Sequence, residues 1–216
     1  MTHPELSEFH NHNDGVRWRL TEDGVFIEGS GIERTPGDPV TVKRVWEQYH
    51  ADINEWASHY NVYCELILAT ICTETEGHPE ACREEPGFVS DDVTPGRVSV
   101  GLMQTLISTA REALDDAAID RAWLLVPQNS LQAGTAYIAR QHEITQLDPP
   151  KAACAYNAGG IYDNDSQRNR WRMRQYPMGT AEHCDRFVKW FNDAVAMLKT
   201  HEIRPALSLE SFLRDA

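Results

Sequence analysis

Residues 62–77 read VYCELILATICTETEG, and this stretch does most to decide the fold. Apolar residues recur through it at intervals of three and four, which is the spacing of one helical face. The pattern predicts a helix that begins near Tyr63. The helix should end at Gly77, because glycine favours the left-handed turn after a helix and Pro79 cannot continue one.

One carboxylate continues the apolar face of this helix. Ile71 follows Ile67 by four residues, and Glu74 follows Ile71 by three, so all three lie on one face of the helix. Glu76 points elsewhere. A carboxylic acid on an apolar face is desolvated, so it holds its proton to higher pH and can serve as a general acid near neutrality. From this helix alone, a glutamate that reaches solvent past the helix end is the simpler interpretation.

The sequence on both sides predicts a mainly α protein. Helical spacing runs through residues 41–60, returns from Ser108, which we expect to be an N-cap, and recurs in 129–144 and 150–160. The last long helix, in residues 184–199, carries a wide apolar stripe that we assign to the core. We therefore expect one domain over about residues 41–200 and a C-terminal tail over 201–216.

Two segments lack helical spacing. Residues 15–31 hold two short strand-like runs around Asp23 and Gly24, which predicts a small β-hairpin, and residues 32–40 are interpreted as a linker. Residues 1–40 thus form an N-terminal segment. Prolines and glycines interrupt residues 77–100, which predicts a long ordered loop without a regular element, of a kind that often carries function.

Four short motifs follow one another along the chain: LILATICTETEGHP from residue 66, GLMQTLISTA from 101, NSLQAGTAYIA from 129 and AYNAGG from 155. In this order they resemble the signature blocks of the soluble lytic transglycosylases and the related goose-type lysozymes, over roughly residues 60–160. The resemblance implies a lysozyme-like helical domain that needs no cofactor. It also implies cleavage of peptidoglycan between N-acetylmuramic acid and N-acetylglucosamine, leaving anhydro-muramic ends.

The same resemblance assigns roles to residues. Glu74 is expected to be the catalytic acid and then the base, with Tyr156 beside it as the second catalytic residue. Other motif positions are expected to bind the glycan: Thr75, Gly101, Leu102, Met103, Gln104, Asn157 and Ala158. A helix with Asn129, Gly134 and Tyr137 is the remaining match.

The chain departs from the family pattern between the first two motifs. Gly101 comes 27 positions after Glu74, and residues 83–99 have no counterpart that we can match. An inverting hydrolase needs a second carboxylate to activate water, whereas a transglycosylase uses a hydroxyl of its own substrate. The loop offers Asp91 and Asp92 as water-positioning candidates, between Gly87 and Gly96.

Three functions are therefore in competition. We favour the transglycosylase, because a single carboxylate suffices for it. The second is a goose-type lysozyme-like or chitinase-like hydrolase that uses a loop aspartate. The third, a non-catalytic glycan-binding or phage tail module, is disfavoured by the presence of Glu74 at the acid position.

Charge and hydropathy narrow the range of binding partners that the sequence allows. The 33 acidic residues exceed the 20 basic ones, which argues against general nucleic-acid binding. No apolar stretch approaches the length of a membrane span, and the first residues lack the pattern of a signal peptide. We expect synthesis in the cytoplasm and action on the cell wall after phage lysis, virion delivery or injection, with the N-terminal segment as a candidate partner contact.

Three further sequence patterns give less information about function. The five cysteines are odd in number, and Cys64, Cys72 and Cys154 lie among apolar residues, which favours buried thiols over bridges. The arginines of residues 168–174 surround Trp171, and substrate contact and a solvated loop explain them equally well. The N-terminal histidines His10 and His12 have no partner spacing, so we assign no metal.

Overall fold

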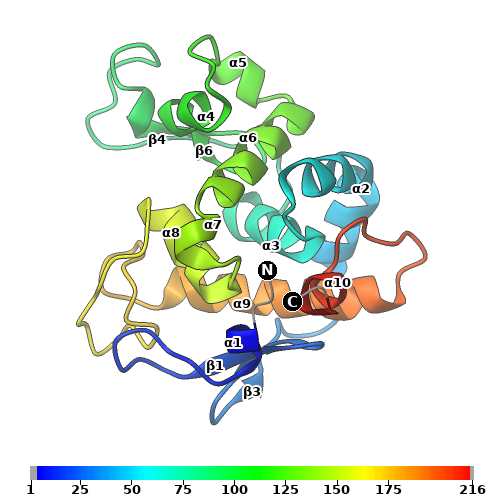
Figure 1. Ribbon diagram of the computed structural model, residues 1–216. Coiled ribbons are helices and arrows are strands. Elements are labelled where there is room, and N and C mark those ends of the chain that lie inside the picture. Colours follow the sequence, from blue (N-terminus) through cyan, green and yellow to red (C-terminus); the bar gives the residue numbers. More distant parts are fainter. Residues whose placement is uncertain (1–3, 215–216) are drawn as a thin grey trace.

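A computed structural model describes residues 4–214. As predicted, the fold is mainly α (Figure 1). Small antiparallel sheets accompany the helices. The helices are α1 (Pro4–Ser7), α2 (Val40–Tyr60), α3 (Cys64–Thr75), α4 (Ile107–Leu114), α5 (Arg121–Leu124), α6 (Pro127–Arg140), α7 (His142–Thr145), α8 (Pro149–Ala158), α9 (Glu182–Thr200) and α10 (Leu209–Arg214). The strands are β1 (Trp18–Thr21), β2 (Gly24–Ile27), β3 (Gly31–Ile32), β4 (Cys82–Glu84), β5 (Val98–Val100) and β6 (Thr105–Leu106).

The described residues form two lobes: a smaller one built on β4, β5, β6, α4 and α5, and a larger one that holds α2, α3, α8, α9 and the sheet of β1, β2 and β3. Helix α3 lies at the centre of the larger lobe, where it packs against α2 and α9. Nearly every residue of α3 is buried, as its apolar sequence predicts. The helix ends because Glu76 adopts a left-handed conformation with a φ of 51°, and Gly77 follows in the same region. The last turn of α3 therefore has a fixed position, and Glu74 is part of it.

The predicted N-terminal hairpin is present. Strands β1 and β2 pair with Thr21 opposite Gly24, and β3 extends them to a three-stranded sheet. The sheet docks on α9 through Asn192, whose side-chain amide bonds both the amide nitrogen and the carbonyl of Val25, at 2.8 and 3.2 Å. Trp18 is fully buried in the same core as α3. Residues 4–39 are thus part of the larger lobe.

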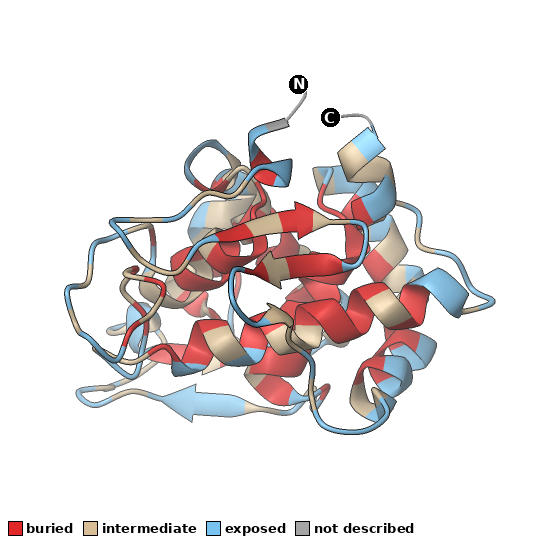
Figure 2. Ribbon diagram, turned by 90° about the horizontal axis from the view of Figure 1, so that it is seen from below, coloured by how far each residue is buried: buried red, intermediate tan, exposed pale blue. Residues whose placement is uncertain are grey.

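The expectation that residues 77–100 hold no regular element is wrong. Strands β4 and β5 lie in that region, with a 3-10 turn at Pro95–Arg97, and they form a second antiparallel sheet with β6, which follows it. The side chains of Val98 and Val100 lie on one face of this sheet and pack against α4 and α6 in a separate, smaller core. All three residues of β4 are exposed (Figure 2), so this strand carries no hydrophobic pattern that would have predicted it.

Two further expectations need correction. Helix α4 begins at Ile107 with Leu106 as its N-cap residue, so Ser108 lies within the first turn and is not the cap. The C-terminal tail contains α10. Leu209 is buried there and donates its backbone N–H to the Glu65 carboxylate at 3.0 Å, which ties the tail to the start of α3.

Trp171 does not face solvent. It is buried in the core and donates its indole N–H to Asp185 at 2.7 Å. Arg170 forms a bidentate pair with Glu33 at 2.9 Å and also bonds Asp185. The structure therefore favours the interpretation of this segment as structural. All five cysteines are free thiols, and only Cys82 among them is exposed.

Candidate active site

Glu74 lies at the C-terminal end of α3, between the two lobes. Its side chain is 18% exposed, and burial raises the pKa of its carboxyl from 4.5 to about 7. The charges of Arg186 on α9 and Arg83 on β4 act in the opposite direction. A carboxyl with this pKa is substantially protonated near neutral pH and can donate that proton.

His183 is the nearest ionisable neighbour, with Nε2 3.8 Å from Glu74 Oε1. Burial lowers the pKa of His183 to about 3, so the ring is neutral at physiological pH and offers no charge to hold Glu74 ionised. Sequence reasoning missed this residue. A single histidine in the first turn of a core helix gives no signal of its own, and only the packing of α9 against α3 brings it here.

Tyr156 lies on α8 close to Glu74. Its hydroxyl donates to the Met103 carbonyl at 2.9 Å and pairs with the Thr105 hydroxyl at 3.1 Å. Burial raises the pKa of Tyr156, and the charge of Glu74 adds to the rise. The hydroxyl therefore stays protonated and holds the segment at residues 103–105 against α8.

Thr75 holds the same segment from the other side. Its hydroxyl donates to the Leu102 carbonyl at 2.7 Å, so the residue after Glu74 fixes the backbone that follows Gly101. Leu102 and Met103 are fully buried, backbone included, so neither residue presents a surface for direct contact with a glycan.

Gly101 and Gln104 shape this turn. The φ of Gly101 is 76°, and a Cβ atom there would lie 2.1 Å from the Leu124 carbonyl oxygen, so only glycine fits. Gln104 donates its side-chain amide to the Ala81 and Gly101 carbonyls at 2.9 and 3.0 Å, and accepts from Ser99. The amide of Gln104 is thus occupied in holding the turn.

Asn157 and Ala158 end α8 at the same place. Asn157 Nδ2 lies 3.4 Å from His183 Nδ1, and its Oδ1 accepts the backbone N–H of Tyr176 at 2.6 Å. Asn157 therefore links α8 to the imidazole beside Glu74. Both Asn157 and Ala158 are partly exposed.

Asp91 is held by a partner within the smaller lobe. Arg121 binds both of its carboxylate oxygens, at 2.7 and 3.0 Å, and also reaches Glu84 at 2.9 Å. The hydrogen bond from Arg121 lowers the pKa of Asp91. Asp92 is exposed, and no hydrogen bond ties it to Glu74. A carboxylate with a lowered pKa is a weak base, so this geometry gives no support to Asp91 as the residue that activates water.

Comparison with known proteins decides the family. The sequence model of the family described as the transglycosylase SLT domain matches residues 52–177, which is more than half of the chain. The chain belongs to this family. The SLT domain is also similar in fold to a solved structure, an inactive glutamate-to-glutamine mutant of the lytic transglycosylase Slt from Pseudomonas aeruginosa.

That structural match has a TM-score of 0.51 at 18% sequence identity. It covers 76% of this chain but only 26% of the Pseudomonas chain, so this SLT domain spans about a quarter of that protein. At this identity the likeness confirms the predicted lysozyme-like fold.

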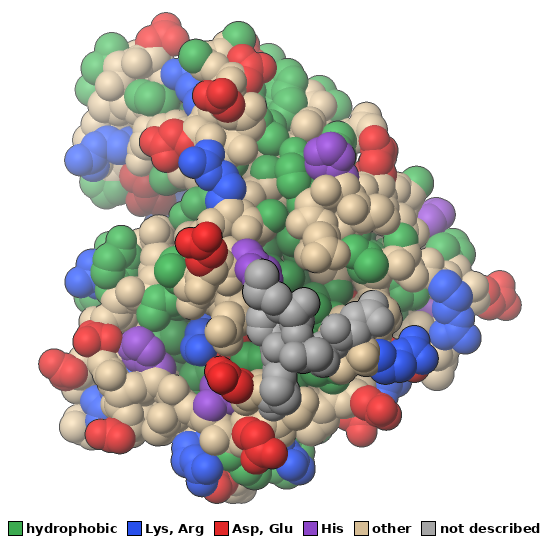
Figure 3. All heavy atoms as spheres, viewed as in Figure 1, with side chains coloured by type: hydrophobic (Ala, Val, Ile, Leu, Met, Phe, Trp, Pro, Cys, Tyr) green, Lys and Arg blue, Asp and Glu red, His purple; other side chains and the backbone are tan. Residues whose placement is uncertain are grey.

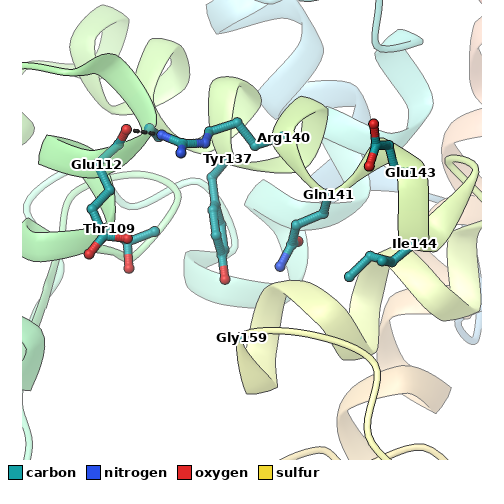
Figure 4. Close-up of a pocket in the computed structure, with 9 residues that line it drawn as sticks. Thr109, Glu112, Tyr137, Arg140, Gln141, Glu143, Ile144 and Gly159 are labelled. Atoms are coloured by element: carbon teal, nitrogen blue, oxygen red, sulfur yellow. Dashed lines mark hydrogen bonds between the residues drawn. The ribbon is translucent and has the colours of Figure 1, made fainter.

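The surface of the SLT domain is hollowed between the lobe of β4, β6 and α4 and the lobe of α8 (Figure 3). A pocket of about 250 Å³ lies between α4, α6, α7 and the end of α8. Figure 4 shows Tyr137 of α6 and Gln141, the residue after this helix, pointing toward Gly159, with Thr109 on the facing helix. The Tyr137 ring lies 5.3 Å from the Tyr156 ring, so the pocket adjoins the surroundings of Glu74.

No group of three metal-ligating side chains that could hold an ion occurs within residues 4–214. In the same range, no helix is long and apolar enough to cross a bilayer.

Proposed function

We propose that this SLT domain is a peptidoglycan lytic transglycosylase that cleaves the bond between N-acetylmuramic acid and N-acetylglucosamine. Glu74 protonates the leaving oxygen as the bond breaks. The carboxylate that remains then accepts the proton of the primary hydroxyl of the muramoyl sugar, whose oxygen closes on the anomeric carbon. No water is consumed, and the proton that Glu74 gave up returns to it.

The observation that carries this proposal is the environment of Glu74. Its pKa is raised to about 7 by burial, and the charged groups that act on it are the two cations Arg83 and Arg186. A hydrolase would place a second carboxylate near the acid, and the loop residue Asp91 is engaged by Arg121 instead. The Pseudomonas lytic transglycosylase supports the same reasoning, since the protein in that structure is a glutamate-to-glutamine mutant and is inactive.

The other site residues support the acid in this proposal. Tyr156 and Thr75 hold the turn at residues 101–104 beside Glu74, while His183 and Asn157 bound its other side. The pocket next to Tyr137 is proposed to hold a neighbouring sugar of the strand, because an aromatic ring with amide and hydroxyl groups around it suits a pyranose. Delivery to the wall by phage lysis, in a virion or by a secretion system stays a prediction.

Mass spectrometry of the products tests the proposal. Purified sacculi digested by the protein should release muropeptides that are one water lighter than lysozyme products and that lack a reducing end. Glu74→Gln should abolish release. Glu76→Gln is the matched control, since Glu76 is an exposed glutamate two residues away, and it should retain activity. Reducing-end products from the wild-type protein would instead support the hydrolase.

A further inference from the structure

Arg186 is an exposed cation at the candidate site that the chemistry above does not use. It follows His183 by three positions on α9, so the two share one helical face, and the His183 ring lies 3.8 Å from Glu74. The charge of Arg186 acts on both His183 and Glu74. Within residues 4–214, no carboxylate forms an ion pair with Arg186.

Arg83 reaches the surroundings of Glu74 from the smaller lobe. Ala81, two residues before it, accepts the Gly101 N–H at 2.8 Å, and the hydroxyl of Thr75, next to Glu74, bonds Leu102 in the same turn. Arg83 lies on β4 opposite Ser99, which alternates along β5 with the buried Val98 and Val100. The side chain of Arg83 therefore belongs to the face of the sheet that is turned away from the smaller core. It is 73% exposed, and its one ion pair is with the neighbouring Glu85 at 3.0 Å.

Neither arginine helps Glu74 to act as an acid. Both charges favour its ionised form and oppose the burial that keeps it protonated. The protein as a whole carries a net charge of −13, so two exposed cations around one buried acid are not explained by composition. Arg186 has no ion pair within residues 4–214, and Arg83 pairs only with the neighbouring Glu85 at the surface, so both remain accessible to an anion that the substrate brings.

We propose that Arg83 and Arg186 together bind a carboxylate of the substrate next to the scissile bond, one from each lobe. This inference rests on the proposed function, because peptidoglycan carries carboxylates beside the glycan: on the peptide stems, or on the lactyl group where a stem has been removed. Guanidinium groups suit this partner, since they donate paired hydrogen bonds to carboxylates. Binding would also offset the charge that opposes the proton on Glu74, so the acid would gain its proton as substrate arrives.

The test compares three glycans with the wild-type protein and with Arg83→Gln, Arg186→Gln and the double variant. The first substrate is sacculi with intact stems. The second is amidase-treated strands, which expose lactyl carboxylates. The third is the same strands after amidation of those carboxylates, which makes them neutral. Arg168→Gln, an exposed arginine outside the site, is the control.

We expect the double variant to lose roughly tenfold in kcat/KM on a carboxylate-bearing glycan, mainly through KM, and less than about twofold on the neutral strands. A loss on sacculi alone identifies the stem carboxylates as the partner, and a loss on amidase-treated strands identifies the lactyl group. Equal losses on all three substrates, or none, would overturn the inference.

A second readout separates binding from a general electrostatic effect. On neutral strands, the double variant should shift the alkaline limb of the pH–rate profile upward, because the two cations no longer favour ionised Glu74. The failure of the proposed function would look different: the wild-type protein would then yield no anhydro product from any of the glycans.

Discussion

Helix α3 carries two glutamates at opposite ends, one buried and one mostly buried, and they allow a matched experiment. Glu65 is 3% exposed and lies at the start of the helix, where it accepts the backbone N–H of Leu209. Glu74 lies at the other end, next to His183. Burial raises the pKa of each carboxyl from 4.5 to about 7. Glutamine at either position keeps the side-chain volume but has no charge to bury.

The sign of the effect follows from linkage. A carboxyl whose pKa is higher in the folded than in the unfolded state stabilises the fold fully below about pH 4.5, and this contribution is lost as pH rises through about 7. The size of the rise corresponds to about 3 kcal/mol per residue. Glu65→Gln and Glu74→Gln should each gain up to that much in free energy of unfolding, relative to wild type, between about pH 4 and about pH 9.

Urea unfolding followed by circular dichroism at several pH values measures this gain. Activity then separates the two variants, since Glu74→Gln should be inactive and Glu65→Gln should turn over like the wild type. A stability difference between each variant and the wild type that does not change with pH would refute the reasoning. It would mean that neither carboxyl is desolvated in the folded protein.

Three further predictions test the rest of the site. Tyr156→Phe should lower turnover by roughly 10 to 100-fold, measured by release of muropeptides, because the turn beside the acid loses its hydrogen bond. Asp91→Asn combined with Asp92→Asn should change turnover little while lowering the free energy of unfolding by about 1 kcal/mol or less; a hundredfold loss of activity would favour the hydrolase. Gly101→Ala should lower the melting temperature strongly, because a methyl group cannot fit against the Leu124 carbonyl, and a melting curve like that of the wild type would contradict the tight turn.

The long helices were predictable because their signals are local, whereas the short helices α1, α5 and α10 were not predicted. The apolar spacing of residues 62–77 and the glycine after it are sufficient to place α3, and the same holds for α8 and α9. Strand β4 was not predictable, since all its side chains are exposed and its pairing partner β5 lies beyond a long loop. Pairing between distant exposed segments leaves no periodicity in either one.

The residues of the candidate site also differ in whether the sequence could predict them. Glu74 was found because its position in the helix and the motif that contains it both appear within a few residues. His183, Arg83 and Arg186 reach the acid only through the packing of α9 and β4, and nothing adjacent to them in the sequence indicates it. Trp171 shows the converse, because an aromatic residue among arginines suggested a surface, whereas the structure buries it.

Because the protein has two separate hydrophobic cores, its two lobes should differ in how readily they unfold. The smaller core is built from a few residues of β5, α4 and α6, whereas the larger one includes both ends of the described chain. A cluster of that size should exchange its amide hydrogens through sub-global unfolding, at a lower free energy than the rest. A glycan that touches both lobes binds only the ordered form, so saturation with substrate analogue should slow exchange in β4, β5 and α4 by mass action while leaving α3 and α9 almost unchanged.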